Sequence, residues 1–377
     1  MPNLYDYKAL KDGAIAKGLP RYMYEPIDEP LYPESAWERL PDYYTAHVAE
    51  RNATVQKLLS EQDGCEAFVF FSDAHVRQNR MSSVPILRSI LQNTGVKTVF
   101  YGGDTVSAWA DDGSLVEDIN YFAHAFSFAK PYMVRGNHDM YGKLFEYANT
   151  GAVKSNRELY ELIFRVGAER VVGEEGKTYY YFDHPDTATR YIIIDTNEIL
   201  TPYHDEKGVW NCDVSISSTE IEWFLSLLNR TPANWGVVVL GHTPFYRELR
   251  WAFPKACIFG DLIEAYNQRK CFSAMSWDGA DSFPVKADFT AAQGEVLLTV
   301  CGHGHIDDTY ISPSGCVNFE IHCDAVLTDN GGSPFARVPG TVSENVLDVM
   351  IINRHSGKIH AVRYGAGVDR EVKPWRA

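Results

Sequence analysis

The chain has 377 residues, with 35 Lys and Arg against 50 Asp and Glu, so its formal net charge is −15. Hydrophobic residues make up 45% and charged residues 23%, which is typical of a globular protein and argues against global disorder. The acidic balance disfavours a general nucleic-acid binder, because non-specific affinity for DNA depends on basic side chains that neutralise phosphates. The length predicts one large folding unit with additions.

The apolar pattern indicates neither a leader nor a membrane span. The longest apolar runs, such as residues 67–71 and 236–240, are only long enough for strands, and the N-terminal residues form no continuous apolar stretch. The seven cysteines are scattered without CxxC pairs, so disulfides and a structural zinc site are not expected. We therefore expect a soluble, cytoplasmic protein with reduced thiols.

The predicted elements follow an order typical of α/β proteins. Residues 1–33 predict an irregular arm and residues 35–60 an amphipathic helix broken by Pro41, and together they make a segment, 1–66, that packs on the main domain of residues 67–377. The predicted strands of that domain are 67–71, 98–101, 132–134, 179–182, 191–195, 237–240, 296–300 and a closing hairpin of 346–352 and 359–364. The predicted helices are 84–92, ended by Gly95, a second one from about 218–220, and 262–269 within an insertion at 243–293.

This order predicts an α/β fold with two packed sheets. Parallel strands separated by helices form a sheet covered on both faces, and the paired strands 179–182 and 191–195 indicate a second sheet packed on the first. Ligands of such sheets bind beyond the carboxyl ends of the strands. We expect the insertion at 243–293 to lie beside the same rim, as functional loops do.

Polar clusters stand where five predicted strands end. They are Ser72-Asp73-Ala74-His75, Gly102-Gly103-Asp104, Gly136-Asn137-His138-Asp139, Gly241-His242 and Gly302-His303-Gly304-His305. On extended backbone, residues two apart such as Asp73 and His75 point the same way, so each such pair can converge on one ion. Any single one of these residues is more often a cap or a loop residue than a ligand. As a set they offer enough carboxylate, amide and imidazole ligands for two metal ions.

Glycine stands beside four of the clusters, as Gly103, Gly136, Gly241 and Gly302. Either these glycines only mark turns from strand to loop, or they let the backbone turn tightly around a buried ion.

The blocks D-A-H, G-G-D, G-N-H-D, G-H-T and G-H-G-H, in this order between residues 67 and 307, resemble the five motifs of the calcineurin-like metallophosphoesterase superfamily. Residues 218–223 are similar to a helix start common before the fourth motif, and residues 363–370 to the tail of some bacterial and phage members. The resemblance implies a four-layer αββα fold, in which two mixed β-sheets packed as a sandwich are flanked by helices, with two divalent metals at the strand ends.

The resemblance also implies a role for each block residue. It assigns Asp73, His75 and His305 to one metal, Asn137, His242 and His303 to the other, and Asp104 to the bridge between them. The metals would be Mn, Fe, Zn or Ni, and a hydroxide between them would attack phosphorus in line. His138 would assist the leaving group, unless it is only a loop histidine. Asp139 would order that imidazole or merely begin the next turn.

The second block departs from two branches of the superfamily. Ser107 and Ala108 stand where protein Ser/Thr phosphatases carry an Asp-Arg pair, and Ser107 cannot bind ferric iron as the tyrosine of purple acid phosphatases does. We therefore expect neither a protein phosphatase nor a purple Fe(III) site. Substrate contacts would have to come from elsewhere, and the nearest candidates in sequence are Arg77, Asn79 and Arg80, although such loop residues are usually solvated.

Aromatic residues follow several blocks and allow two interpretations. Trp109, Tyr141, Phe245, Tyr246 and Trp251 could stack on a ring of the substrate or pack the loops against the core.

The function predicted from these features is dinuclear metal-dependent hydrolysis of a small or medium soluble phosphate ester, with monoester and diester both open. We expect no membrane partner, and the sequence leaves the oligomeric state open. The alternatives are an inert interaction scaffold of the same fold, a nuclease or cyclic-nucleotide phosphodiesterase, and a mononuclear hydrolase of other bonds. The net charge of −15 disfavours nucleic acid, though a local basic groove would allow it.

Overall fold

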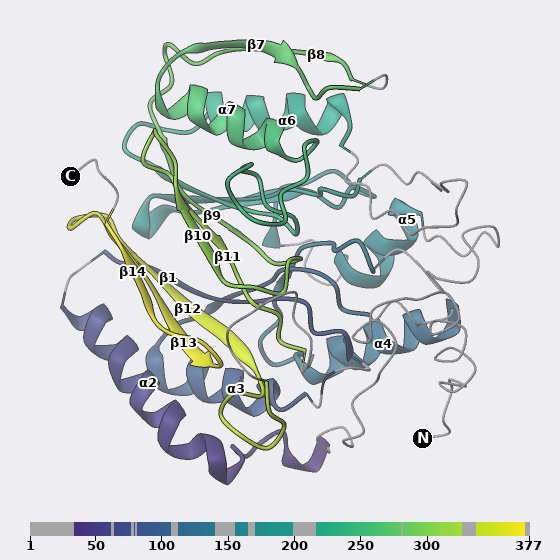
Figure 1. Ribbon diagram of the computed structural model, residues 1–377, viewed down its shortest axis with the longest axis vertical. Helices are drawn as coiled ribbons and strands as arrows, with labels where there is room; N and C mark the ends of the chain where they lie inside the picture. The colour runs from purple at the N-terminus through teal and green to yellow at the C-terminus, as the bar shows by residue number, and fades with distance from the viewer. Residues whose placement is uncertain are drawn as a thin grey trace.

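A computed structural model describes residues 34–61, 64–76, 79, 81–106, 112–139, 155–164, 170–198, 216–279, 282–325 and 337–373. Two six-stranded sheets pack face to face, with helices on both outer sides (Figure 1). The prediction of a two-sheet α/β sandwich flanked by helices is confirmed. Within these ranges, no helix combines the length and the apolar composition needed to cross a membrane.

The first sheet has the strand order β14-β13-β12-β1-β2-β3. Its strands are β1 (Glu66–Phe71), β2 (Thr98–Tyr101), β3 (Tyr132–Met133), β12 (Val346–Asn353), β13 (Lys358–Gly365) and β14 (Arg370–Val372). β1, β2 and β3 are parallel, and β12 runs antiparallel to β1. The accompanying helices are η2 (Glu34–Ala36), α2 (Asp42–Ser60), α3 (Ser83–Thr94) and α4 (Asp112–Ala125). α2 and α3 cover the outer face (Figure 1), and α3 ends at Gly95, whose φ of 81° is the left-handed C-cap that the sequence predicts.

The second sheet has the order β10-β11-β9-β6-β5-β4. Its strands are β4 (Tyr180–His184), β5 (Thr189–Ile193), β6 (Gly236–Leu240), β9 (Glu295–Cys301), β10 (Asp308–Ile311) and β11 (Val317–Glu320). The four central strands, β11, β9, β6 and β5, are parallel. Its outer face is covered by α6 (Ser218–Asn229) and α7 (Cys257–Asn267), beyond which lies a hairpin of β7 (Cys271–Met275) and β8 (Pro284–Asp288) (Figure 1). The short elements α5 (Asn156–Leu159), η4 (Tyr160–Phe164) and η6 (Pro185–Thr187) complete the described helices.

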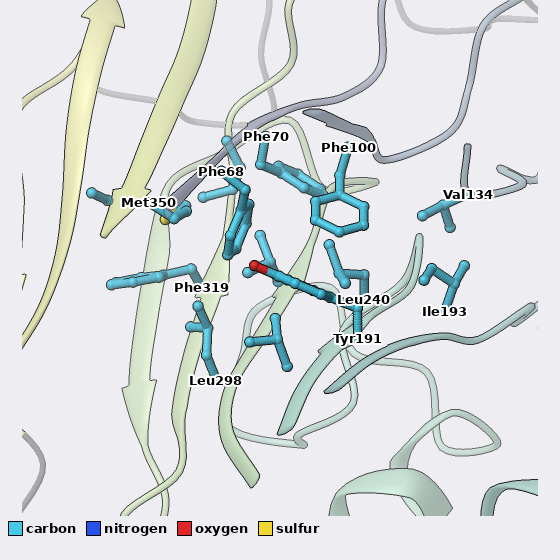
Figure 2. Close-up of a cluster of buried hydrophobic side chains, with 14 of the residues drawn as sticks. Phe68, Phe70, Phe100, Val134, Tyr191, Ile193, Leu240, Leu298, Phe319 and Met350 are labelled. Atoms are coloured by element: carbon cyan, nitrogen blue, oxygen red, sulfur yellow. The ribbon is translucent and has the colours of Figure 1, made fainter. Parts of the chain in front are cut away.

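The main core lies between the two sheets. Alternation along β1 sends Phe68 and Phe70 into this core and Val69 and Phe71 toward α2 and α3. Figure 2 shows Phe68 and Phe100 facing side chains of the second sheet such as Tyr191, and the rings of Phe68 and Phe100 meet edge to face at 5.2 Å between centroids. A strand that is buried on both faces must be apolar throughout, which explains the unbroken apolar run at residues 67–71.

The structure corrects several expectations. The sequence did not predict α4, β10, β11, β14 or the β7–β8 hairpin, and it placed the helix of the insertion at 262–269 although α7 already begins at Cys257. Nine of the eleven residues of α7 are buried, so the helix lacks the polar face that marks an amphipathic pattern. The insertion does not lie at the rim as a whole, because α7 and the hairpin cover the outer face of the second sheet. The expected arm at residues 1–33 lies outside the described residues.

Candidate metal centre

The polar clusters meet at one edge of the sandwich because they follow neighbouring strands. The loop after β1 is tied to the loop after β2, since the Asp73 N–H donates to the Gly103 carbonyl at 2.9 Å. In the second sheet, the Gly302 N–H donates to the His242 carbonyl at 3.0 Å. The His303 N–H, in turn, lies 3.1 Å from Oδ2 of Asp73 and so joins the two sheets. Backbone hydrogen bonds therefore fix the loops that carry the candidate ligands.

Three groups of side chains at this edge could hold a metal ion. Each offers ligand atoms within 4.8 Å of one another, and they are Asp73 with His75 and His305, Asp104 with His242 and His303, and His75 with Asp104 and His138. Asp104 belongs to two of the three groups. Its Oδ2 lies 3.3 Å from Nε2 of His242 and 4.0 Å from Nε2 of His75. The carboxylate of Asp104 thus stands between the groups.

The nitrogen and oxygen ligand atoms point at one another. Nε2 of His75 and Nε2 of His305 are 3.1 Å apart, and the Asn137 Oδ1 lies 3.0 Å from both Nε2 of His242 and Nδ1 of His303. Nδ1 of His75 lies 3.0 Å from the Val106 carbonyl, which can only accept, so this nitrogen carries the proton and Nε2 keeps its lone pair.

Asn137 also fits a cation ligand. Its Nδ2 is buried without a hydrogen-bond partner among the described residues, so the oxygen rather than the amino group is aimed at the histidines. Hard oxygen and imidazole ligands that converge in a buried site fit divalent cations.

The electrostatics of the site favour positive charge between the ligands. Burial lowers the pKa of His75 and of His303 to about 3, so both rings are neutral, the form that binds metal. Burial opposes the ionised form of Asp73, but its hydrogen bond with His305 and the charge of His242 lower its pKa to about 2. Although burial opposes protonation of His242, the Asp104 carboxylate raises the pKa of that ring to about 10. A proton on His242 therefore supplies the positive charge that a cation would bring.

The backbone at the candidate ligands differs from the expected geometry. Five ligand residues have positive φ, namely Asp73 (55°), His75 (40°), Asp104 (58°), His303 (73°) and His305 (53°). The prediction that each Asp or His pair converges on extended backbone was wrong, because the chain turns sharply after each strand and this turn aims the side chains inward. Left-handed backbone costs a non-glycine residue about 1–2 kcal/mol, and such strain concentrates at functional sites.

Two of the glycines are required by close approach. A Cβ on Gly136 would lie 2.1 Å from Oδ1 and 2.2 Å from the backbone nitrogen of Asp104, and a Cβ on Gly302 would lie 2.3 Å from Oδ2 of Asp73. At these positions the backbone packs directly on a candidate ligand carboxylate, which goes beyond marking a turn.

His138 lies beside the shared carboxylate. Its backbone N–H donates to Oδ1 of Asp104 at 2.8 Å, its Nε2 lies 3.7 Å from Oδ2, and its ring faces the His75 ring at 5.1 Å between centroids. The side chain keeps 14% of its surface exposed, whereas Asp104 keeps 2%. The imidazole therefore borders both the ligands and the solvent side of the site.

Asp139 is fully buried and holds two blocks together. Its carboxylate accepts backbone N–H groups of Asp104 at 3.0 Å, Thr105 at 2.7 Å and Gly136 at 2.9 Å. Burial and the charge of Asp104 raise the pKa of Asp139 to about 6. These contacts make Asp139 a positioning residue of the loops.

Of the three predicted substrate residues, only Asn79 lies within the described part of the chain. Asn79 is fully buried, donates to Oδ2 of Asp324 at 2.9 Å and accepts the Met81 N–H at 2.7 Å, so it stabilises its loop and is not open to a substrate. Arg77 and Arg80 lie outside the described residues, as do Ser107, Ala108, Trp109 and Tyr141.

The described aromatic residues that follow the blocks include both buried and exposed side chains. Phe245 and Tyr246 pack in the core under α7, in line with the packing interpretation, whereas Trp251 is 42% exposed.

Sequence reasoning missed a buried ion pair behind the third block. Arg135 and Asp195 are both fully buried and form a two-pronged contact, with Nε to Oδ1 at 3.1 Å and Nη2 to Oδ2 at 2.7 Å. Arg135 immediately precedes Gly136, and Asp195 follows β5 of the other sheet. The spacing of residues in the sequence does not show which residues of different sheets contact each other. The only sequence signal for Arg135 and Asp195 was that each stands at the end of a predicted strand.

Comparison with known proteins identifies the family. Residues 67–307 match the model of the calcineurin-like phosphoesterases, which spans well over half of the chain. The chain belongs to the calcineurin-like phosphoesterase family. Family membership and the His/Asp groups support a phosphoesterase that uses divalent metal ions.

Among similar solved structures, one supports the fold. A dimetal phosphatase from Danio rerio has a TM-score of 0.53 at 12% identity, over 82% of this chain and 98% of that one. A phosphopantetheinyl hydrolase from Mycobacterium tuberculosis has a TM-score of 0.34 at 13% identity, over 68% and 89%. None of the curated proteins compared with the chain matches it.

Proposed function

We propose that this phosphoesterase is a dinuclear metal-dependent hydrolase of small or medium soluble phosphate esters. The observation that carries the proposal is the position of the buried Asp104 carboxylate. It groups with His242 and His303 on one side and with His75 on the other, and His75 itself groups with Asp73 and His305. In this proposal Asp73, His75 and His305 hold one ion, Asn137, His242 and His303 hold the other, and Asp104 bridges them. Mn, Fe, Zn and Ni all suit this ligand set, and availability selects among them.

When bound, two such ions supply an activated water for attack on phosphorus and neutralise the phosphoryl oxygens. The residues of the chain provide the rest. Asp73 and Asp104, buried and ionised, fix the charge that holds the site together. His138, beside Asp104 and partly open to solvent, donates a proton to the leaving oxygen. Asp139 keeps the loops of Asp104 and Gly136 in register.

The charge balance of the protein is compatible with anionic esters. A chain with net charge −15 repels phosphates at long range, but bound cations reverse the sign of the potential locally. The alternative of an inert scaffold is disfavoured, since all seven proposed ligands and His138 gather at one edge of the sandwich with their ligand atoms facing one another.

Hydrolysis of matched chromogenic esters tests the proposal. Metal-depleted protein resupplied with Mn²⁺ is assayed with 4-nitrophenyl phosphate and bis(4-nitrophenyl) phosphate, alongside Asp104→Asn and the control Asp183→Asn, which lies on β4 away from the centre. We expect metal-dependent turnover in the wild type and the control and its loss in Asp104→Asn. The ratio of the two rates ranks monoester against diester. Turnover that is independent of metal, or that survives in Asp104→Asn, would refute the dinuclear assignment.

A further inference from the structure

The first part of the insertion brings an exposed aromatic residue to the metal centre. A Cβ on Gly304 would lie 2.3 Å from Cδ1 of Trp251, and Gly304 sits between the proposed ligands His303 and His305. The Phe253 ring faces the His303 imidazole at 5.2 Å between centroids and 63°. The two aromatic residues therefore border the ligands directly, although they come from a separate loop.

This loop is held firmly against the second sheet. Phe245, Tyr246 and Leu249 are buried in the core under α7. Successive turns, with the Leu249 N–H donating to the Tyr246 carbonyl at 3.1 Å and the Ala256 N–H to the Phe253 carbonyl at 3.0 Å, lead into α7. Trp251 is thus presented from a short anchored segment.

The indole of Trp251 stays open in spite of its size. It is 42% exposed and has no ring partner among the described residues, whereas Trp277 of the same insertion packs against Phe283 at 5.3 Å. Ligand sites combine aromatic side chains with a few convergent polar groups, and the Trp251 indole lies beside such groups.

A basic side chain, that of Arg250, directly precedes Trp251 in the chain. Arg250 is exposed, and within the described part of the chain its guanidinium forms no ion pair. Burial raises the pKa of Glu320 to about 9, and the charge of Arg250 opposes this rise. A Cβ on Gly304 would lie 1.8 Å from Oε1 of Glu320, so Glu320 and Trp251 both approach Gly304, and the charge of Arg250 reaches this point.

We propose that Trp251, with Phe253 beside it, forms a stacking platform for a planar ring in the leaving group of the substrate. The ester oxygen leaves phosphorus with a proton, water supplies the oxygen that replaces it, and the ring remains on the released alcohol. Arg250 attracts the negative charge of the ester. The preferred substrates are then ring-bearing esters such as nucleoside phosphates. The inference rests on the proposed function, whose substrate class it names.

Two matched ligand pairs test the platform. Adenosine 5′-monophosphate and ribose 5-phosphate share the same leaving oxygen and differ in the ring, and phenylphosphonate and methylphosphonate form a pair that is not hydrolysed. kcat/KM is measured for the esters, and calorimetry with Mn²⁺-loaded protein gives the Kd of the phosphonates. The variants are Trp251→Ala and Trp251→Phe, with Trp277→Phe as the control from the same insertion.

We expect Trp251→Ala to weaken the ring-bearing member of each pair about tenfold and to leave the ring-free member within about twofold, because stacking acts on the ring alone. Trp251→Phe should restore most of the preference for the ring-bearing member of each pair. Trp277→Phe should leave kcat/KM and Kd of both members unchanged. Equal loss for both members of a pair, or no loss, would overturn the inference. Phosphonate binding needs no turnover, so a ring preference without hydrolysis would refute only the proposed function, and hydrolysis without a ring preference would refute only the platform.

Discussion

The ion pair behind the third block should control one metal site. Arg135 contacts Asp195 with two nitrogens, donates from Nη1 to Oδ1 of Asn156 at 2.6 Å and reaches the Asn197 carbonyl with Nη2. It thereby joins β3 of the first sheet to the end of β5 in the second. Because Asn137 is only two residues further on, the anchor sets where its amide oxygen lies between the histidines.

Arg135→Lys keeps the positive charge but removes the planar guanidinium that contacts both oxygens of Asp195. A Lys ammonium cannot make the two-pronged contact, so at least one charge-assisted hydrogen bond to a fully buried carboxylate is lost, at about 1.5–3 kcal/mol each. The free energy of unfolding of the metal-free protein should fall by roughly 2 kcal/mol, which a stability of about 5–15 kcal/mol tolerates. Outer residues that orient metal ligands typically change affinity about 10–100-fold. We expect the ion held with Asn137 to bind at least about tenfold more weakly and the other ion to bind unchanged.

Arg190→Lys is the matched control. Arg190 makes a similar fork with Asp183, with distances of 2.8 and 2.9 Å, on the same strand β5 but at its other end. The assay is urea unfolding together with Mn²⁺ titration of metal-free protein by calorimetry. Both variants should lose stability, and only Arg135→Lys should weaken one of two binding steps. Unchanged metal affinity in Arg135→Lys, or an equal loss in Arg190→Lys, would refute the coupling.

Three further predictions concern the site and the fold. His138→Ala should lower kcat strongly while elemental analysis finds the metal content kept, and an emptied site would show that His138 is a ligand. Gly136→Ala should lower the metal content, because its Cβ would displace Asp104, and full occupancy would contradict the close packing. Burial opposes the ionised form of Glu66, but hydrogen bonds from His184 and others lower its pKa below 4.5, and Glu66 raises the pKa of His184 above 6.5. This pair therefore stabilises the fold most between pH 4.5 and 6.5 and loses its effect below that range as Glu66 is protonated and above it as His184 is deprotonated. His184→Ala should flatten the dependence of Tm on pH across both limits, and an unchanged profile would exclude the linkage.

Much of the fold could be predicted because its central strands leave a strong pattern. Strands buried on both faces, such as β1 and β6, are unbroken apolar runs bounded by glycine and polar residues. Such runs are easy to recognise in the sequence. The β7–β8 hairpin was missed because β7 is largely exposed and mixes polar with apolar residues. Short edge strands such as β14 carry too few residues for a period to show.

The site residues could be gathered from sequence because each stands at the end of a strand. Their order along the chain made the set recognisable, although the reason given for their convergence, an extended backbone, was wrong. The Asn79 amide was misjudged because its partner, Asp324, lies 245 residues away and nothing local indicates burial. Arg135, Phe253 and Glu320 were missed for the same reason, since their neighbours at the site come from other strands and loops.

The most direct test of the dinuclear centre is a crystal structure of Mn²⁺-loaded protein with anomalous diffraction data that locate the ions. We predict two anomalous peaks at the strand ends, one bound by Asp73, His75 and His305 and one by Asn137, His242 and His303, with Asp104 touching both. A single peak, or peaks that leave Asp104 without a metal contact, would contradict the assignment.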